Sequence, residues 1–283
     1  MKLGIHAYAW CSQWSNATLD LIDRVARLEL DFIELPLMTL DTFDAAAVKK
    51  RLADAGIDAV TSTVLLKGTD ITSFDPAVRA AGIAYLKDCV RATAEIGKTN
   101  LSGVVYSEHV KNANARPTEQ EREWAAEGLR EAAVYARELG VQIGLEPVNR
   151  YESNLVNTCE QALSLKARIG EPNIKIHLDT YHMNIEEKSF YDATKAAGHD
   201  LVHYHLCEND RGIPGTGLVD WDAIFRALGE MKYDGYAALE SFVDVTDNMN
   251  TWVWRQLAPS GDALVAEGVA FIRGKMAQHG LTG

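Results

Sequence analysis

Short apolar runs rich in β-branched residues recur along the chain, separated by longer segments with helical spacing. The runs span residues 3–9, 32–37, 58–65, 101–106, 141–148, 174–178, 202–206 and 236–242. Apolar runs of this length, bounded by polar or glycine-containing segments, are typical of buried strands. An apolar stripe typical of a helix face lies between the first two runs and consists of Leu19, Ile22, Val25, Ala26 and Leu28. The pattern predicts eight strands alternating with eight helices.

Residues that favour helix ends lie where this pattern needs them. Capping pairs, in which threonine or asparagine is followed three residues later by glutamate or glutamine, are Thr118 with Glu121, Thr158 with Gln161 and, more loosely, Asn184 with Glu187. Gly56 and Gly140 fall just after predicted helices, where a left-handed residue closes the last turn. These signals support helices between the predicted strands.

Strands that alternate with helices form βαβ units and a parallel sheet. Eight units favour a single closed (β/α)₈ TIM barrel, which typically needs about 250 residues, and the chain has 283. A doubly wound dinucleotide-binding sheet is disfavoured because no GxGxxG follows the first strand. No low-complexity linker or charge block marks a boundary, so we expect one domain over residues 1–283.

Composition narrows the function classes. The net charge of −12 disfavours a nucleic-acid partner, whose phosphates are bound by clustered lysine and arginine. Residues 1–14 are interrupted by polar side chains and predict a strand rather than a signal peptide, and no apolar run approaches the roughly 18 residues of a membrane span. The four cysteines, at positions 11, 89, 159 and 207, form no CxxC pair. We therefore expect reduced thiols and a cytoplasmic protein without nucleic-acid or membrane partners.

Residues with metal-binding side chains stand at the ends of the last four predicted strands. They are Glu146, Asp179, His205 and Glu240. Active sites of (β/α)₈ barrels are built at the carboxyl ends of the strands. Solvation explains such a series poorly, because buried carboxylates are costly unless they are paired or metal-bound. Three carboxylates and one imidazole suit Mn²⁺, Mg²⁺ or Co²⁺ and would leave about two positions of an octahedron for substrate oxygens.

Neighbouring polar residues are expected to have other roles. His177 and His203 each lie two residues before a predicted ligand and share its strand face, so we expect both inside the barrel rather than on the metal. Glu208 and Asp210 are expected to be loop charges.

Two arginines and a tryptophan are candidates for substrate contacts. Arg150 follows the fifth predicted strand and is as consistent with an exposed loop position as with the site. Arg211 lies in the loop RGIPGTG, six residues after His205, and is suited to reach a substrate oxygen. Trp14, after the first strand, offers an apolar wall to a sugar-binding cleft or else belongs to the core.

At these residues the sequence resembles the ketose 3-epimerases, the D-tagatose and D-psicose (allulose) 3-epimerase group of the xylose-isomerase-like barrels. The resemblance is carried by the segments DTYHMNIEE from Asp179, EPVNRYE from Glu146, HYHLCENDRGIPGTG from His203 and the terminal ALESF. It runs over most of the chain from Ala132 onward and is weaker in the first hundred residues.

The resemblance implies roles for individual residues. The predicted ligands Glu146, Asp179, His205 and Glu240 would bind Mn²⁺ or a similar ion, with Co²⁺ or Mg²⁺ as alternatives. Glu146 and Glu240 would also be the proton-transfer pair. The residues that would hold substrate oxygens near C1 and C2 are Glu152, His182 and Arg211. The family also implies a homodimer or homotetramer and a small-molecule sugar as the partner.

The chain also departs from the family pattern. His6, which we expect to contact the substrate, stands where the family commonly carries an aromatic residue, and Ser241 replaces a proline that often follows the last glutamate. The loop after the fourth strand, YSEHVKNANARP, lacks the aromatic residue expected there. These differences leave the metal chemistry intact and leave the identity of the sugar open.

Such a site suits proton transfer at C3 of a ketose. The C3 proton lies beside a carbonyl but is too weakly acidic for an unaided carboxylate. A divalent ion chelated by O2 and O3 stabilises the enediolate, and His182 and Arg211 would add charge-assisted hydrogen bonds. Epimerisation removes a proton from one face and returns one to the other, which two carboxylates allow without an organic cofactor. One carboxyl group must be ionised while the other is protonated.

Other functions use parts of the same pattern. An aldose–ketose isomerase, a hydroxypyruvate-type isomerase or an epimerase of oxidised glycosides would employ the same enediolate chemistry. A DNA-repair endonuclease would need further histidine ligands and a basic groove, which the charge of −12 disfavours. A non-catalytic sugar-binding barrel would not need both Glu146 and Glu240. We expect a free rather than a phosphorylated ketose because the loops ENDRGIPGTG and SFVDVTDNMN carry acidic residues.

Overall fold

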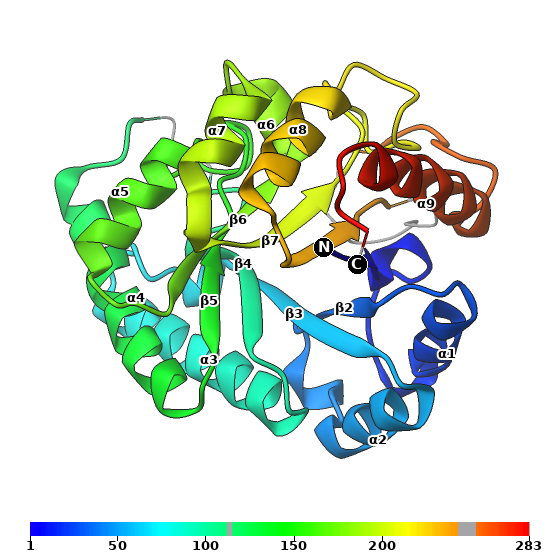
Figure 1. The fold of residues 1–283 in the computed structure, drawn as a ribbon. Helices are drawn as coiled ribbons and strands as arrows, with labels where there is room; N and C mark the ends of the chain where they lie inside the picture. The colour runs from blue at the N-terminus through cyan, green and yellow to red at the C-terminus, as the bar shows by residue number, and fades with distance from the viewer. Residues whose placement is uncertain (112–114, 243–252, 283) are drawn as a thin grey trace.

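Eight parallel strands close into one barrel in the computed structural model, which describes residues 1–111, 115–242 and 253–282 (Figure 1). The strands are β1 (Lys2–His6), β2 (Phe32–Pro36), β3 (Asp58–Leu65), β4 (Asn100–Glu108), β5 (Gln142–Leu145), β6 (Ile174–Asp179), β7 (Leu201–Leu206) and β8 (Tyr236–Leu239). Each pairs with its neighbour in the chain, and β8 closes the sheet on β1 with Tyr236 opposite Lys2. The predicted (β/α)₈ barrel is confirmed.

Helices surround the barrel on its outer side (Figure 1). They are α1 (Asp20–Arg27), α2 (Ala45–Ala55), α3 (Pro76–Glu95), α4 (Glu119–Glu138), α5 (Cys159–Ile169), α6 (Thr180–Glu186), α7 (Phe190–Ala197), α8 (Trp221–Met231) and α9 (Gly261–Gln278). Two helices, α6 and α7, follow β6, where the pattern predicts one. Within the described ranges, no helix combines the length and the apolar character that a membrane span requires.

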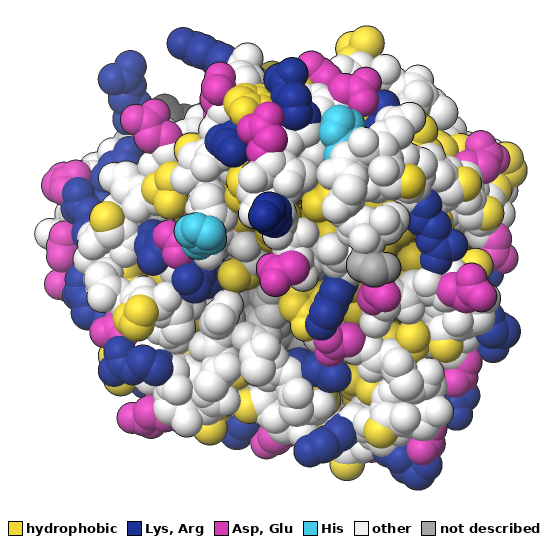
Figure 2. Space-filling model, in the orientation of Figure 1, with side chains coloured by type: hydrophobic (Ala, Val, Ile, Leu, Met, Phe, Trp, Pro, Cys, Tyr) yellow, Lys and Arg dark blue, Asp and Glu magenta, His cyan; other side chains and the backbone are white. Residues whose placement is uncertain are grey.

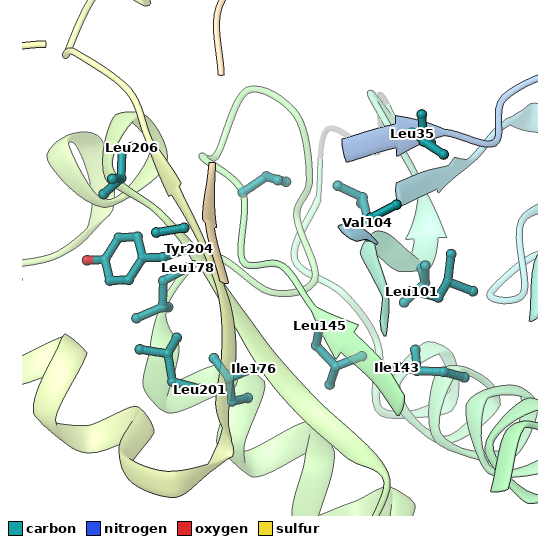
Figure 3. Close-up of a cluster of buried hydrophobic side chains, with 14 of the residues drawn as sticks. Leu35, Leu101, Val104, Ile143, Leu145, Ile176, Leu178, Leu201, Tyr204 and Leu206 are labelled. Atoms are coloured by element: carbon teal, nitrogen blue, oxygen red, sulfur yellow. The ribbon is translucent and has the colours of Figure 1, made fainter. Parts of the chain in front are cut away.

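Strand side chains alternate between the barrel interior and the surrounding helices. Along β7, His203 and His205 face the interior and contact Glu34 of β2, whereas Tyr204 faces outward and its hydroxyl meets Thr194 of α7. Figure 3 shows buried apolar side chains of the barrel strands; those it labels include Leu35, Leu101, Ile143, Leu145, Ile176, Leu178 and Leu206. Burial on both faces explains why the strands appear in the sequence as continuous apolar runs.

Several predicted helix ends are confirmed. Thr118 and Glu121 form a reciprocal capping box at the start of α4. Thr158 caps α5 by accepting a hydrogen bond from the backbone of the third helical residue. Gly56 and Gly140 follow α2 and α4 with positive φ angles of 67° and 71°, a conformation that glycine adopts without steric cost.

Some local boundaries differ from the sequence prediction. The pair Asn184 and Glu187 does not begin a helix, because the carboxylate of Asp179 at the end of β6 already caps α6, which contains residue 184. The first strand ends at His6, since residues 7–9 turn into a 3₁₀ helix that this histidine caps. Strand β8 ends one residue before Glu240, so that this glutamate projects from the strand end rather than from within the strand.

Asp58 joins three strands at their amino-terminal ends. Its carboxylate accepts hydrogen bonds from Lys2 of β1 at 2.8 Å, from Lys98 at 2.9 Å and from the hydroxyl of Tyr236 of β8 at 2.8 Å. Burial alone would raise the pKa of Asp58, but these hydrogen bonds have the larger effect and hold the pKa well below its usual value. The first and last strands of the barrel are thereby tied to β3.

We expect Asp58→Asn to lower the free energy of unfolding by about 1–3 kcal/mol, the usual cost of leaving hydrogen-bonding groups unmatched. Because the folded pKa lies below the unfolded value of about 3.9, the wild-type contribution is complete above that value and is lost as the pH falls through the folded pKa. Denaturant titrations of both proteins at neutral pH and at about pH 3 measure this difference. A stability gap of equal size at both pH values would contradict the role of the ionised carboxylate.

Candidate active site

The four predicted ligands converge at the carboxyl ends of β5 to β8. Nδ1 of His205 lies 3.6 Å from Oε1 of Glu146, 3.5 Å from Oδ2 of Asp179 and 3.4 Å from Oε2 of Glu240. None of the four residues is more than 9% exposed. The alternation of strand side chains directs His205 into the barrel, while the ends of β5, β6 and β8 bring the three carboxylates to it.

The donor set fits a divalent metal ion. Nδ1 of His205 is buried and has no hydrogen-bond partner in the described part of the chain. The separations of 3.4–3.6 Å from this atom to the carboxylate oxygens are close to the roughly 3.0–3.4 Å between neighbouring ligands of an ion with bonds of about 2.1 Å. Three carboxylates gathered around one nitrogen atom repel one another unless positive charge lies among them. Their oxygen atoms suit a hard ion better than a thiolate-preferring one.

Arg211 supplies positive charge at the same place. Its Nη1 donates to Oδ2 of Asp179 at 2.7 Å and to Oε2 of Glu240 at 2.6 Å. The guanidinium carbon lies 4.2 Å from the centroid of the Tyr181 ring, in cation–π contact. Arg211 has a positive φ of 66°, and its carbonyl accepts a hydrogen bond from Oγ of Ser241 at 2.6 Å. The loop after β7 therefore directs this arginine inward, as the sequence analysis expects.

The pKa values of Glu146 and Glu240, the predicted proton-transfer pair, are shifted in opposite directions. Burial raises the pKa of Glu146. Burial also acts to raise the pKa of Glu240, but the positive charges of His205 and Arg211 outweigh burial and lower it. For His205, burial acts to lower the pKa, and the carboxylates of Glu240 and Glu34 raise it well above its usual value. Unequal pKa values of two neighbouring carboxyl groups are what an acid/base pair requires.

Glu152 and His182 are fixed beside this group by Asn149 and His109, two residues without a predicted role. Asn149 donates from Nδ2 to Oε1 of Glu152 at 2.8 Å and from its backbone nitrogen to Nδ1 of His182 at 3.1 Å. Nε2 of His109 lies 2.8 Å from Oε2 of Glu152. Burial acts to raise the pKa of Glu152, but His182 and the hydrogen bond with His109 lower it to about 2. Both side chains are therefore held in fixed orientations at the cavity wall.

Arg150 lies outside the site. Its guanidinium is exposed and pairs with Glu186 of α6 at 2.8 Å. Glu208 also differs from the expected loop charge, since it is fully buried. Its carboxylate accepts hydrogen bonds from the backbone of Gly215 at 2.8 Å and of Val219 at 3.0 Å, and therefore fixes the loop after β7. Asp210 is the loop charge expected from the sequence and pairs with a surface arginine.

A cavity of about 470 Å³ opens above these residues. Its polar lining includes Glu146, Glu152, His182, His205, Arg211 and Glu240. Trp14, which is 3% exposed, forms part of an apolar wall. His6 also lines the cavity, although its Nε2 lies 3.2 Å from Oγ of Ser62 and its Nδ1 accepts from the backbone of residue 8. The cavity brings together every substrate-contact residue expected from the sequence except Arg150.

Further buried groups surround the site, and their positions could be predicted from the sequence only in part. Glu34 contacts His203 and His205 from β2, and its signal in the sequence is an acidic residue in the middle of the apolar run FIELP. Cys207 lies with its Sγ 3.6 Å from Oδ2 of Asp179, a position that follows from its alternation with His205 along the chain. His177 is fully buried inside the barrel, as predicted, yet neither ring nitrogen has a hydrogen-bond partner within the described ranges.

Known proteins resemble this chain over nearly its whole length. A family model described as xylose isomerase-like TIM barrel matches residues 22–275. A ketose 3-epimerase from Arthrobacter globiformis is 37% identical, over 98% of this chain and 97% of that protein. An L-ribulose 3-epimerase from Methylomonas sp. (strain DH-1) is 36% identical, over 96% of this chain and 97% of that protein. The similarity thus includes the part of the chain before Ala132.

A solved structure shows the same similarity in three dimensions. The crystal structure of D-allulose 3-epimerase from Methylomonas sp. in complex with D-allulose superimposes with a TM-score of 0.93. The two chains are 35% identical, and the comparison covers 97% of each.

Proposed function

Because the chain belongs to the ketose 3-epimerase group of the xylose isomerase-like TIM-barrel family, we propose that it epimerises a free ketose at C3 with one divalent metal ion. The arrangement of Glu146 and Glu240 carries this proposal. They follow β5 and β8, two strands that are separated in the barrel wall by β6 and β7. Both carboxylates nevertheless come within 3.6 Å of Nδ1 of His205. Two carboxylates that approach one centre from different strands suit proton transfer on two faces of one carbon.

The metal would be held by Glu146, Asp179, His205 and Glu240. When bound, a divalent ion acts as a Lewis acid that makes the proton on C3 more acidic and orients the sugar. Mn²⁺ is our first candidate because the donors are mostly carboxylate oxygens with one imidazole, and Co²⁺ and Mg²⁺ are the alternatives. Nδ1 of His205 has no hydrogen-bond partner among the described residues, which supports this assignment.

Glu146 and Glu240 would exchange protons with C3. The carboxylate that faces the C3 proton removes it, and the other carboxyl group returns a proton to the opposite face. In the reverse reaction their roles are exchanged. Burial raises the pKa of Glu146, whereas the positive charges of His205 and Arg211 lower the pKa of Glu240, so the two carboxyl groups lie in different electrostatic surroundings, as an acid/base pair needs.

His182, Arg211 and Glu152 would hold the sugar oxygens near C1 and C2. Nη2 of Arg211 lies 3.3 Å from Nε2 of His182, and Nε2 of His182 lies 3.9 Å from Oε1 of Glu146. Donors at these positions can stabilise negative charge that develops on a sugar oxygen during proton removal. Trp14 would cover the apolar side of the sugar and exclude water.

A free sugar suits the site better than a sugar phosphate. The charge of Arg211 is engaged by Asp179 and Glu240. The carboxylates of Glu146, Glu152 and Glu240 line the cavity and would repel a phosphate dianion. In the loop SFVDVTDNMN, which follows β8, residues 243–250 lie outside the described residues. On the face seen in Figure 2, acidic and basic side chains are interspersed.

The site of proton exchange tests this proposal. With Mn²⁺ and a free ketose in D₂O, we expect deuterium to enter at C3 of both epimers, because the proton removed by one carboxyl group exchanges with solvent before the other returns one. Nuclear magnetic resonance of the products locates the label. Deuterium only at C1 or C2, together with an aldose product, would assign the protein to the isomerases. A strong preference for the phosphorylated ketose would refute the choice of a free sugar.

A further inference from the structure

The carboxylate of Glu34 lies inside the barrel, next to the proposed metal site. Glu34 belongs to β2, is opposite His6 of β1 in the sheet register and has no exposed surface. Burial of an ionised carboxylate is costly unless hydrogen bonds or opposite charges compensate. Here Oε2 lies 2.7 Å from Nε2 of His203 and 2.9 Å from Nε2 of His205. Two imidazole nitrogens from β7 therefore meet one oxygen that comes from β2.

This contact determines which nitrogen of His205 faces the three proposed carboxylate ligands. An ionised carboxylate only accepts hydrogen bonds, so Nε2 of the ring carries the hydrogen that Glu34 receives. The other nitrogen, Nδ1, then points to Glu146, Asp179 and Glu240 at 3.4–3.6 Å. Oε2 of Glu34 meets two imidazole nitrogens, and a neutral carboxyl group could donate only one hydrogen to them, so this geometry favours an ionised acceptor.

We infer that Glu34 is a positioning residue, which fixes the orientation and tautomer of His205 so that Nδ1 is available to the metal. The inference rests on the metal site of the proposed function. Because Glu34 has no exposed surface, it acts through His205 rather than on the sugar. Carboxylates that accept from the second nitrogen of a metal-bound histidine typically improve metal affinity by about 10- to 100-fold. His203 shares the same oxygen and limits rotation of the carboxylate.

The test measures Mn²⁺ binding directly, from the electron paramagnetic resonance signal of free Mn²⁺ in titrations of the metal-depleted protein. Glu34→Gln keeps the volume but removes the charge, and we expect the dissociation constant to rise by about 10- to 100-fold. Glu34→Asp keeps the charge but withdraws the carboxylate by one methylene group. Glu34→Asp should also weaken Mn²⁺ binding. If Glu34 only balanced charge, this variant would bind Mn²⁺ as tightly as the wild type.

Asp58→Asn is the matched control, because it also removes a hydrogen-bonded carboxylate but at the amino-terminal ends of the strands. It should lower stability and leave the Mn²⁺ dissociation constant unchanged. In the Mg²⁺-loaded wild type, ¹⁵N resonances should show His205 protonated at Nε2, and Glu34→Gln should shift that signal.

Equal dissociation constants for the wild type and both folded Glu34 variants would overturn the positioning role and leave the metal site standing. If only one of the two Glu34 variants folds, its Mn²⁺ dissociation constant is compared with that of the wild type: a rise supports the positioning role, and an unchanged value overturns it. A wild type that binds no Mn²⁺ would refute the metal site itself, and the role of Glu34 with it.

Discussion

Glu146→Gln is expected to reduce kcat by more than the roughly 10²- to 10⁴-fold that loss of a proton-transfer group usually causes, and Glu240→Gln should do the same. Each glutamate is assigned two tasks, proton transfer at C3 and metal binding, so that each substitution removes both. Glutamine preserves the volume of the side chain and a carbonyl oxygen, and the fold should therefore be retained. Measurement of kcat and KM at saturating Mn²⁺, with circular dichroism as a check on folding, tests both variants.

Arg150→Gln provides the control for these variants. Arg150 follows the same strand as Glu146 but is exposed and pairs with Glu186 away from the cavity. Its substitution should leave kcat close to the wild-type value, because neither Arg150 nor Glu186 lines the cavity. Retention of more than a small fraction of wild-type activity by folded, metal-loaded Glu146→Gln or Glu240→Gln would rule out the mechanism with two glutamates.

Removal of the metal should abolish activity and lower the melting temperature. We expect EDTA-treated protein to lose its activity and to melt at a lower temperature, because a ligand that binds only the folded state stabilises it by mass action. At a free metal concentration about 100 times the dissociation constant, this stabilisation is about 2.7 kcal/mol. The charges of His205 and Arg211 among the carboxylates should keep the treated protein folded at room temperature.

Elemental analysis and re-addition of ions make this experiment decisive. Activity should return with Mn²⁺, Co²⁺ or Mg²⁺, and the order of recovery identifies the preferred ion. Full activity in protein shown to be free of metal would mean that the convergence of the four residues serves another purpose. A melting temperature that does not change when Mn²⁺ is added would argue against binding at this site.

The sequence predicts the fold and the proposed ligands because both depend on local pattern. The apolar runs locate the eight strands, and residues at the carboxyl ends of neighbouring parallel strands must meet at one end of a barrel. Glu146, Asp179, His205 and Glu240 could be placed together without knowledge of any side-chain conformation. The inward position of His203 and His177 follows from the two-residue alternation of strands in the same way.

The remaining contacts depend on residues that are distant in the chain. The hydrogen bond from His205 to Glu34 joins residues separated by 171 positions. The sequence around each residue predicts its strand, but it does not predict that these two side chains meet. Loop conformation is equally hard to predict: Arg150 and Arg211 both follow strands, yet one is exposed and the other is 6% exposed. The difference arises from the buried Glu208 and the positive φ of Arg211, which shape the loop after β7.

The closure of β1 on β8 determines when the barrel can be completed during synthesis. Lys2 and Tyr236 are 234 positions apart, so that β1 leaves the ribosome long before its second neighbour exists. At about 5–20 residues per second, the interval is on the order of ten to fifty seconds. One edge of β1 has no partner strand in this time, and unpaired strand edges invite pairing with other chains. The nascent chain is therefore most exposed to aggregation in the interval before β8 emerges.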